Sequence, residues 1–420
     1  MGSELFLFTA SYPYGLGENW KRDELNILSQ YYNSITIYPF TYGGNNQPKS
    51  LQPNVKADHP VLDTMSHMRR HIHKIFTGGR FRFYLSELFR SQVYKKRTWT
   101  ISWLVASIQT ELLCRSMQYR KISDHLLQQP VLYFFWSREW AYVVPFLKKK
   151  GFSKIFVRFH GYDLYEERES NRGYIPFRKP LLKSLNLAVL LSEQAKKYLH
   201  SKYPTVHFTS IVVPLGTIEK GPSHASTDGI FRIVTCSGVT EVKRLHLLTE
   251  ALEFADHQIE WTHIGDGPLL ENLMNQAKTL PSNVKAHFAG KMKTDEVLEF
   301  YKNNVFDLFV NVSESEGMPV SVIEAFSAHI PAIATNVGGT AVLVTPETGI
   351  LLSPDPLPKE IWTAIKKFRD LSSECRLEFR RRAYDHFKRN FFSIENAKKL
   401  LDHFIKAENG AKPFQHNINQ

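Results

Sequence analysis

Cysteine is scarce in this chain of 420 residues, which holds only Cys114, Cys236 and Cys375, far apart from one another. This spacing excludes a disulfide framework and the paired cysteines of zinc sites. No uninterrupted apolar run approaches the roughly 18 residues that a membrane-spanning helix needs. The apolar segment at residues 4–10 is short and lacks a basic leader, so we expect a first buried strand, not a signal peptide, and a cytoplasmic protein.

Acidic residues are scarce in the first half of the chain. Residues 1–215 hold 30 Lys and Arg against 15 Asp and Glu, a balance of +15, and the remainder holds 23 against 26, which together give the net charge of +12. Between residues 69 and 99, basic residues are interleaved with aromatic ones, and Glu87 is the single acid. We expect this region to contact an anionic membrane surface, and the chain to be peripheral on the inner face of the membrane. Solvated helix faces and nucleic acid are the alternatives, but no nucleic-acid motif accompanies the charges, so we expect no nucleic-acid partner.

The length of the chain and the position of its turn-forming residues predict two α/β domains. Apolar runs at residues 5–10, 131–136 and 154–159 read as strands, and residues 65–125 read as mostly helical. The polar, turn-forming run at residues 217–229, TIEKGPSHASTDG, separates the halves, and a new strand is expected at residues 231–237. We therefore place an N-terminal domain at residues 1–215, a C-terminal domain at 216–385, and a last helix with a frayed tail at 386–420.

One βαβ unit is predicted within residues 307–339, DLFVNVSESEGMPVSVIEAFSAHIPAIATNVGG. Residues 307–312 read as a buried strand, 313–318 as a loop, and 319–328 as a helix with Pro319 in its first turn. A second strand at residues 331–335 is followed by a tight turn at Gly338 and Gly339. Such units bind ligands at the carboxyl ends of their strands.

Two carboxylates eight positions apart fall on this ligand edge. Glu316 lies in the predicted loop, and Glu324 lies one to two turns into the helix, close to the same edge. Between them, the amides of the helix start can bind a phosphate, and carboxylates accept hydrogen bonds from vicinal hydroxyls. The arrangement therefore suits a nucleotide sugar, which carries a sugar, a diphosphate and a ribose. The alternative is that both glutamates are solvated surface charges.

The segment VSESEGMPVSVIEAFSAHIPAIATNVGG resembles the Glu-x7-Glu signature of the retaining family-4 glycosyltransferases. TASYPYGLGE, RFHGYDL, VPLGT and IGDGPL extend the resemblance along nearly the whole chain. It implies the GT-B fold, in which two Rossmann-like, doubly wound parallel-sheet domains face a cleft. It also implies a metal-independent hexosyltransferase without a cofactor, whose donor is a UDP- or GDP-sugar. The metal-binding Asp-x-Asp motif of many other glycosyltransferases is absent from this sequence.

The resemblance also implies roles for single residues. Glu316 corresponds to the residue that approaches the donor sugar, Glu324 to the ribose ligand and Lys243 to the phosphate ligand. His160, after a predicted strand, corresponds to the histidine that faces the sugar. The donor-binding set is completed by smaller or flanking residues: Gly15, Gly17, Arg244, Gly290, Gly317 and Met318.

Three positions depart from the family pattern. Gly238 stands where family members place a phosphate-binding Arg, Pro319 where many have a residue with a free amide, and Val342 where an acidic residue is common. Arg244 is a candidate to compensate for the missing Arg. These departures leave a second hypothesis open, a catalytically degenerate binding or scaffold subunit.

The sequence thus predicts a glycosyltransferase that moves a sugar from a nucleotide sugar to a saccharide or lipid-linked acceptor during cell-surface polysaccharide biosynthesis. A nucleotide-sugar epimerase of the same fold is a further alternative, although the additional acid and base that it needs are not apparent. No metal site is expected.

Overall fold

The computed structural model describes residues 3–14, 21–44, 47–62 and 71–409. The chain divides into two compact units: residues 1–213 together with 397–420, and residues 214–396. The predicted boundary at 215/216 lies two residues after the first division. Among the described residues, no helix is long and apolar enough to cross a bilayer.

The first unit is built on a parallel sheet that holds seven strands within the described ranges, in the order β3-β2-β1-β4-β5-β6-β7. The central strands are apolar and buried on both faces, as the strands of parallel sheets covered by helices must be. The strands are β1 (Glu4–Thr9), β2 (Ser34–Pro39), β3 (Val55–Ala57), β4 (Val131–Phe134), β5 (Ile155–Arg158), β6 (Leu187–Leu190) and β7 (Ser210–Val212).

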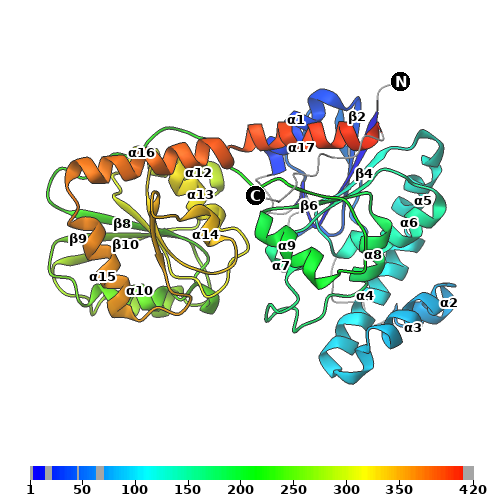
Figure 1. Cartoon of the computed structure of the whole chain (residues 1–420), viewed down its shortest axis with the longest axis horizontal. Coiled ribbons are helices and arrows are strands. Elements are labelled where there is room, and N and C mark those ends of the chain that lie inside the picture. Colours follow the sequence, from blue (N-terminus) through cyan, green and yellow to red (C-terminus); the bar gives the residue numbers. More distant parts are fainter. Residues whose placement is uncertain (1–2, 15–20, 45–46, 63–70, 410–420) are drawn as a thin grey trace. The chain divides into compact units, whose positions relative to one another are not determined.

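Helices cover this sheet, and those between residues 74 and 124 form a layer with an apolar core of its own around Tyr84 and Trp103. The helices are α1 (Lys21–Tyr31), α2 (Lys74–Thr77), α3 (Phe81–Arg90), α4 (Arg97–Arg115), α5 (Met117–Asp124), α6 (Val144–Lys150), α7 (Gly161–Leu164), α8 (Arg178–Ser184) and α9 (Glu193–Lys202). In Figure 1, α2 and α3 project beyond α4 at the margin of the unit.

The second unit has a parallel sheet that holds six strands, in the order β10-β9-β8-β11-β12-β13, within its fully described range. Figure 1 shows α10 and α15 on one side of this sheet and α12, α13 and α16 on the other. The strands are β8 (Phe231–Cys236), β9 (Ile259–Ile264), β10 (Val284–Gly290), β11 (Leu308–Asn311), β12 (Ala332–Thr335) and β13 (Gly349–Leu352). The helices are α10 (Leu245–Leu252), α11 (Leu270–Ala277), α12 (Thr294–Asn303), α13 (Val320–Ser327), α14 (Thr340–Leu343), α15 (Pro358–Arg369) and α16 (Ser373–Asn390).

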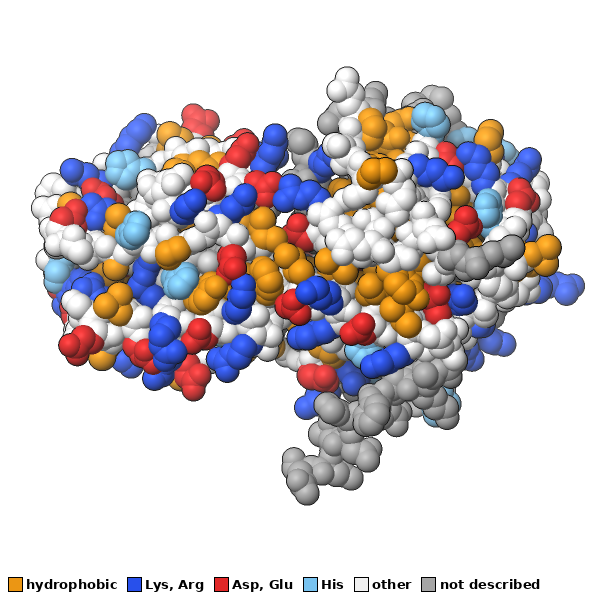
Figure 2. All heavy atoms as spheres, turned by 90° about the horizontal axis from the view of Figure 1, so that it is seen from above, with side chains coloured by type: hydrophobic (Ala, Val, Ile, Leu, Met, Phe, Trp, Pro, Cys, Tyr) orange, Lys and Arg blue, Asp and Glu red, His pale blue; other side chains and the backbone are white. Residues whose placement is uncertain are grey.

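Acidic and basic side chains are interspersed on the face of the second unit that Figure 2 shows. On α16, for example, Arg381 pairs with Glu378 at 2.7 Å and with Asp385 at 2.8 Å. On α16, basic side chains are thus balanced by acidic ones next to them.

The last helix, α17 (Ser393–Glu408), starts within the second unit, and from Ala397 onward it belongs to the first. Its Phe404 ring packs on Tyr133 at 4.9 Å and on Phe156 at 4.6 Å between ring centroids. All three side chains are buried, so the helix is an integral part of the core of the first unit.

The predicted βαβ unit is present as β11, α13 and β12, and one detail of it was wrong. Pro319 is the residue before α13, with an extended backbone (φ −70°, ψ 101°), and does not lie in the first turn. A helix can begin directly after such a residue, because proline fixes φ but leaves ψ free to be extended.

Candidate functional site

The candidate site of the second unit lies at the carboxyl ends of β8 and β11. These strands are neighbours in the sheet, and the chain order reverses between them, which is where open α/β sheets bind ligands. The loop after β8 is tied to the loop after β11, because the amide of Glu314 donates to the carbonyl of Val242 at 2.8 Å. The first loop carries Lys243, and the second carries Glu316.

An ion pair joins these two residues. The Lys243 Nζ lies 2.6 Å from the Glu316 Oε1, and the Asn311 Nδ2 donates to the same oxygen at 3.3 Å. The Glu316 side chain is 11% exposed and that of Lys243 is 24% exposed, so both remain within reach of a ligand. Asn311, the last residue of β11, was missed by the sequence analysis; its place at a strand end was the available signal.

Glu324 lies on α13 and is 6% exposed. Burial raises the pKa of its carboxyl to about 8. Two further groups adjoin it, the thiol of Cys236 at the end of β8 and the hydroxyl of Tyr301 on α12; burial raises the pKa of each, and Glu324 adds to both shifts. The prediction that Glu324 is close to the ligand edge agrees with this position, whereas the alternative of a solvated helix charge is wrong.

Two glycines, Gly338 and Gly339, allow the loops of this edge to approach one another. A Cβ on Gly338 would lie 1.8 Å from the Glu316 carbonyl oxygen, and one on Gly339 would lie 2.4 Å from that of Gly317. The amide of Gly339 donates to this Gly317 oxygen at 2.8 Å. Met318, next in the chain, is 7% exposed. The turn after β12 therefore holds the backbone of residues 316–318 in place.

We expect Gly338→Ala to disrupt this support. Gly338 has φ +54°, where an L-residue costs roughly 1–2 kcal/mol, and the added methyl meets the Glu316 carbonyl. Chemical denaturation should show a loss of stability at least about twice that of Gly229→Ala. Gly229 is the matched control, because its φ is +82° and a Cβ there meets nothing within 4 Å. Equal losses in the two variants would contradict a close packing of the two loops.

Arg244 has structural contacts of its own, and its predicted part in donor binding stays a prediction. Its guanidinium donates to the carbonyls of Val312, Ser313 and Pro354, and pairs with Asp355 at 2.8 Å. These contacts tie the ends of β11 and β13 to the loop after β8. The side chain therefore positions the loops, and its contacts give no support to its prediction as a donor-binding residue or as a replacement for the missing Arg at Gly238.

Gly290 ends β10 with φ +74°, and its carbonyl accepts from the amide of Gly265 at 2.9 Å. A Cβ on Gly290 would meet nothing within 4 Å, so the space beside it is open. Its predicted part in binding the donor stays a prediction.

In the first unit, His160 lies two residues after the end of β5, directly before α7, and is 5% exposed. Its ring packs on Trp136 at 4.2 Å and on Phe135 at 4.8 Å. Neither ring nitrogen has a hydrogen-bond partner among the residues that the structure describes. Burial lowers its pKa well below the usual value, and Arg158 and Lys21 lower it further, so the ring is neutral. A buried imidazole in this state has a donor and an acceptor to offer a ligand.

Lys21 was also missed by the sequence analysis. It is 2% exposed, and its ammonium lies 3.8 Å from the centroid of the Phe135 ring, close to His160. Its position at the start of the helix after the glycine-containing loop was the available signal for a residue near the site. The predicted ligands Gly15 and Gly17 lie outside the described residues.

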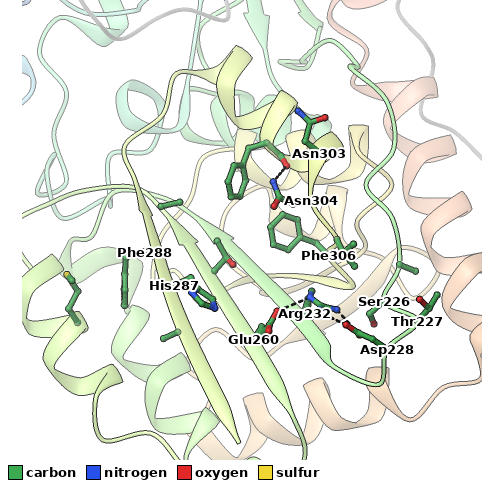
Figure 3. A pocket seen from close by; sticks show the side chains of 17 residues that line it. Ser226, Thr227, Asp228, Arg232, Glu260, His287, Phe288, Asn303, Asn304 and Phe306 are labelled. Carbon is green, nitrogen blue, oxygen red and sulfur yellow. Dashed lines mark hydrogen bonds and ion pairs between the residues drawn. The ribbon is translucent and has the colours of Figure 1, made fainter. Parts of the chain in front are cut away.

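A large hollow of the second unit lies elsewhere. It has a volume of about 760 Å³ and opens over the strands β8, β9 and β10, and no predicted site residue lines it. Figure 3 shows Arg232 on its floor, where it bonds to Glu260 at 2.9 Å and to Asp228 at 2.7 Å. Within the described ranges, no three His, Cys, Asp or Glu side chains are grouped to hold a metal ion.

Comparison with known proteins finds a family similarity in the second unit. Residues 220–386 match the family described as glycosyl transferases group 1. The O-antigen biosynthesis glycosyltransferase WbnH of Escherichia coli is 32% identical over 114 residues, which are 27% of this chain and 31% of WbnH. The match thus spans less than a third of that relative.

Two solved structures cover nearly the whole chain. The lipopolysaccharide outer core galactosyltransferase WaaB has a TM-score of 0.66 at 13% identity, over 96% of this chain and 99% of its own. HepE of Anabaena, in complex with UDP and glucose, has a TM-score of 0.62 at 14% identity, over 96% of this chain and 100% of its own. The chain thus consists of two parallel-sheet units with the GT-B fold, and residues 220–386 of it are similar to the glycosyl transferases group 1.

Proposed function

We propose that the protein is a retaining, metal-independent glycosyltransferase of the hexosyltransferase type. It transfers a sugar from a UDP- or GDP-sugar to a saccharide or lipid-linked saccharide during the synthesis of a cell-surface polysaccharide. The names of WbnH and WaaB support this class of polymer, and the UDP and glucose bound to HepE support a nucleotide-sugar donor.

The observation that carries the proposal is the Lys243–Glu316 pair where β8 and β11 end side by side, together with the buried Glu324 on α13, the helix that follows β11. A cation, a partly exposed carboxylate and a buried carboxyl are thereby gathered at one edge. The diphosphate of the donor draws Lys243 toward itself, which leaves Glu316 to accept hydrogen bonds from the sugar hydroxyls. Glu324 accepts hydrogen bonds from the ribose.

In the transfer step, the bond between the sugar C1 and the diphosphate oxygen breaks, and a bond from C1 to the acceptor oxygen forms on the same face. The acceptor proton passes to the departing diphosphate, so no protein base is consumed. Lys243 and the amides at the start of α13 stabilise the charge that develops on the diphosphate. His160 corresponds by resemblance to a residue that positions the transferred sugar, and its two buried ring nitrogens lack partners among the described residues.

The test is a panel of UDP-, GDP-, ADP- and dTDP-sugars, first by thermal shift and then by mass spectrometry with saccharide and lipid-linked saccharide acceptors. We expect one donor to stabilise the protein and the acceptor to gain the mass of one sugar. A donor that is converted to an isomer without any acceptor gaining mass would indicate an epimerase. Intact nucleotide binding without any turnover would indicate a scaffold subunit.

Gly238 gives a direct test of whether the site is impaired. A Cβ at this position meets only the Asp266 carbonyl, at 3.7 Å, and Gly238 is exposed, so a side chain can start here without a clash. We expect Gly238→Arg to raise the transfer rate at least about tenfold, because one charged donor at a developing anion contributes roughly 2–4 kcal/mol. The comparison variant is Gly238→Gln, which adds length without charge. An unchanged rate in Gly238→Arg would show that the site has no deficit of positive charge.

A further inference from the structure

The helical layer of the first unit is firmly anchored. Glu111 on α4 is fully buried, and its carboxylate bonds to Arg80 at 3.0 Å and to the Tyr84 hydroxyl at 2.8 Å. On the same side, Trp103 donates to the carbonyl of Tyr84 at 3.1 Å. These contacts fix α2 and α3 to α4, so the orientation of their outer side chains is defined.

Large apolar side chains stand in solvent on the outer side of this layer. Phe76 is 66% exposed, Phe89 is 63% exposed and Tyr94 is 55% exposed. They stand in pairs, since the Phe89 and Tyr94 rings lie 6.0 Å apart and Phe76 lies 5.2 Å from Phe81. Single exposed apolar residues are ordinary, whereas paired aromatic rings concentrated on one short helical segment indicate an interaction surface.

The exposed charges within residues 71–101 are of one sign. Glu87 is the only acidic residue between residues 71 and 101, and it turns inward, 7% exposed, to accept from the Tyr174 hydroxyl at 3.0 Å. Burial also raises its pKa, which weakens its negative charge. The basic residues near the exposed rings are Lys74, Arg82, Arg90, Lys95, Lys96 and Arg97. The charges on α16 are paired with acids, whereas residues 71–101 hold no exposed acid that could pair with these basic residues.

We propose that this surface, the outer face of residues 74–97, docks the protein on an anionic lipid bilayer. The aromatic rings enter the boundary between headgroups and acyl chains, and the long basic side chains reach the lipid phosphates. Each basic residue near an anionic surface strengthens binding about fivefold. A nucleic-acid surface would use its rings as stacking platforms in a groove, whereas these rings stand at 55–66% exposure on convex helices.

The proposal is tested by co-sedimentation of the full chain with vesicles of phosphatidylcholine alone and with added phosphatidylglycerol. We expect binding only to the anionic vesicles, and weaker binding at high salt. Arg82→Glu with Arg90→Glu should weaken it at least about tenfold. Phe76→Ser with Phe89→Ser should weaken it at low and high salt alike, because this pair contributes apolar burial.

Matched changes in the second unit serve as controls. Lys285 and Lys367 are exposed basic residues there, and Phe254 is 50% exposed. Lys285→Glu with Lys367→Glu, and Phe254→Ser, should leave vesicle binding unchanged. Equal losses in these controls, binding to neutral vesicles alone, or tighter binding to RNA than to anionic vesicles would overturn the proposal. Vesicle binding needs no donor, so its failure is separable from a failure of the transferase assay.

Discussion

Replacement of Lys243 by Met should lower the rate of sugar transfer by about 10²- to 10³-fold, the usual effect of removing one charged donor from a developing anion. The Lys243 ammonium lies 2.6 Å from Glu316, and the donor diphosphate must compete for it. Without Lys243, the Glu316 carboxylate also repels the diphosphate, so the KM for the donor should rise. The measurement is steady-state kinetics with the donor found in the nucleotide-sugar panel.

Three comparisons give this prediction its control. Lys243→Met should leave the thermal midpoint nearly unchanged, because the side chain is partly exposed and its ion pair lies near the surface. Lys285→Met removes the same charge from an exposed position on β10 and should not affect the rate. Lys243→Arg keeps the charge and should retain more activity than Lys243→Met. Full activity in Lys243→Met would show that the donor diphosphate does not bind at Lys243.

The Lys243–Glu316 contact shows where sequence reasoning stops. Both residues could be proposed as ligands from their loops, but their contact joins positions 73 apart in the chain. It depends on β8 lying next to β11, which is a property of the sheet order and of no local pattern. The same limit explains why Lys21 was missed, since the Phe135 ring that it contacts is distant in the sequence. Asn311 is different, because it contacts Glu316 only five positions away and its place at a strand end was a usable signal.

Local patterns were sufficient for the elements themselves. Apolar runs bounded by turn formers marked β8, β11 and β12 to within one or two residues, because buried parallel strands tolerate few polar residues. The pattern could not show how far a side chain on an amphipathic helix is buried. Glu324 can be read as a solvated charge from its sequence alone, and its burial results from the packing of α13 against α16, α12, β11 and β12, which are separate elements of the unit.

Burial of Glu324 predicts that stability depends on pH. Its pKa is about 8 in the folded state against an ordinary value of 4.5 for a solvated glutamate, so the folded protein holds an additional proton between these values. This group's contribution to stability is therefore complete below about pH 4.5 and is lost as the pH rises through 8. Relative to Glu324→Gln, the wild type should lose up to about 1.4 kcal/mol per pH unit, measured by urea denaturation between pH 5 and 8.5.

Nucleotide binding should remove the proton from the Glu324 carboxyl. A carboxylate that accepts both ribose hydroxyls must be charged, so the nucleotide of the preferred donor must expel the proton from Glu324. We expect its affinity to rise by up to about tenfold per pH unit between pH 6 and 8. Calorimetry in two buffers of different ionisation enthalpy should show the release of one proton. In Glu324→Gln, this release should vanish and the affinity should fall.

A 2′,3′-dideoxy form of the same nucleotide separates the two effects of Glu324. It lacks both ribose hydroxyls, so it should bind weakly and release no proton from the wild type. If the pH dependence of stability is present but both nucleotides bind with equal affinity and without proton release, Glu324 is a buried acid that does not touch the ribose. If neither stability nor nucleotide affinity depends on pH in this way, the Glu324 carboxyl is already charged in the free protein. Water or a neighbouring group must then stabilise this charge at its buried position on α13.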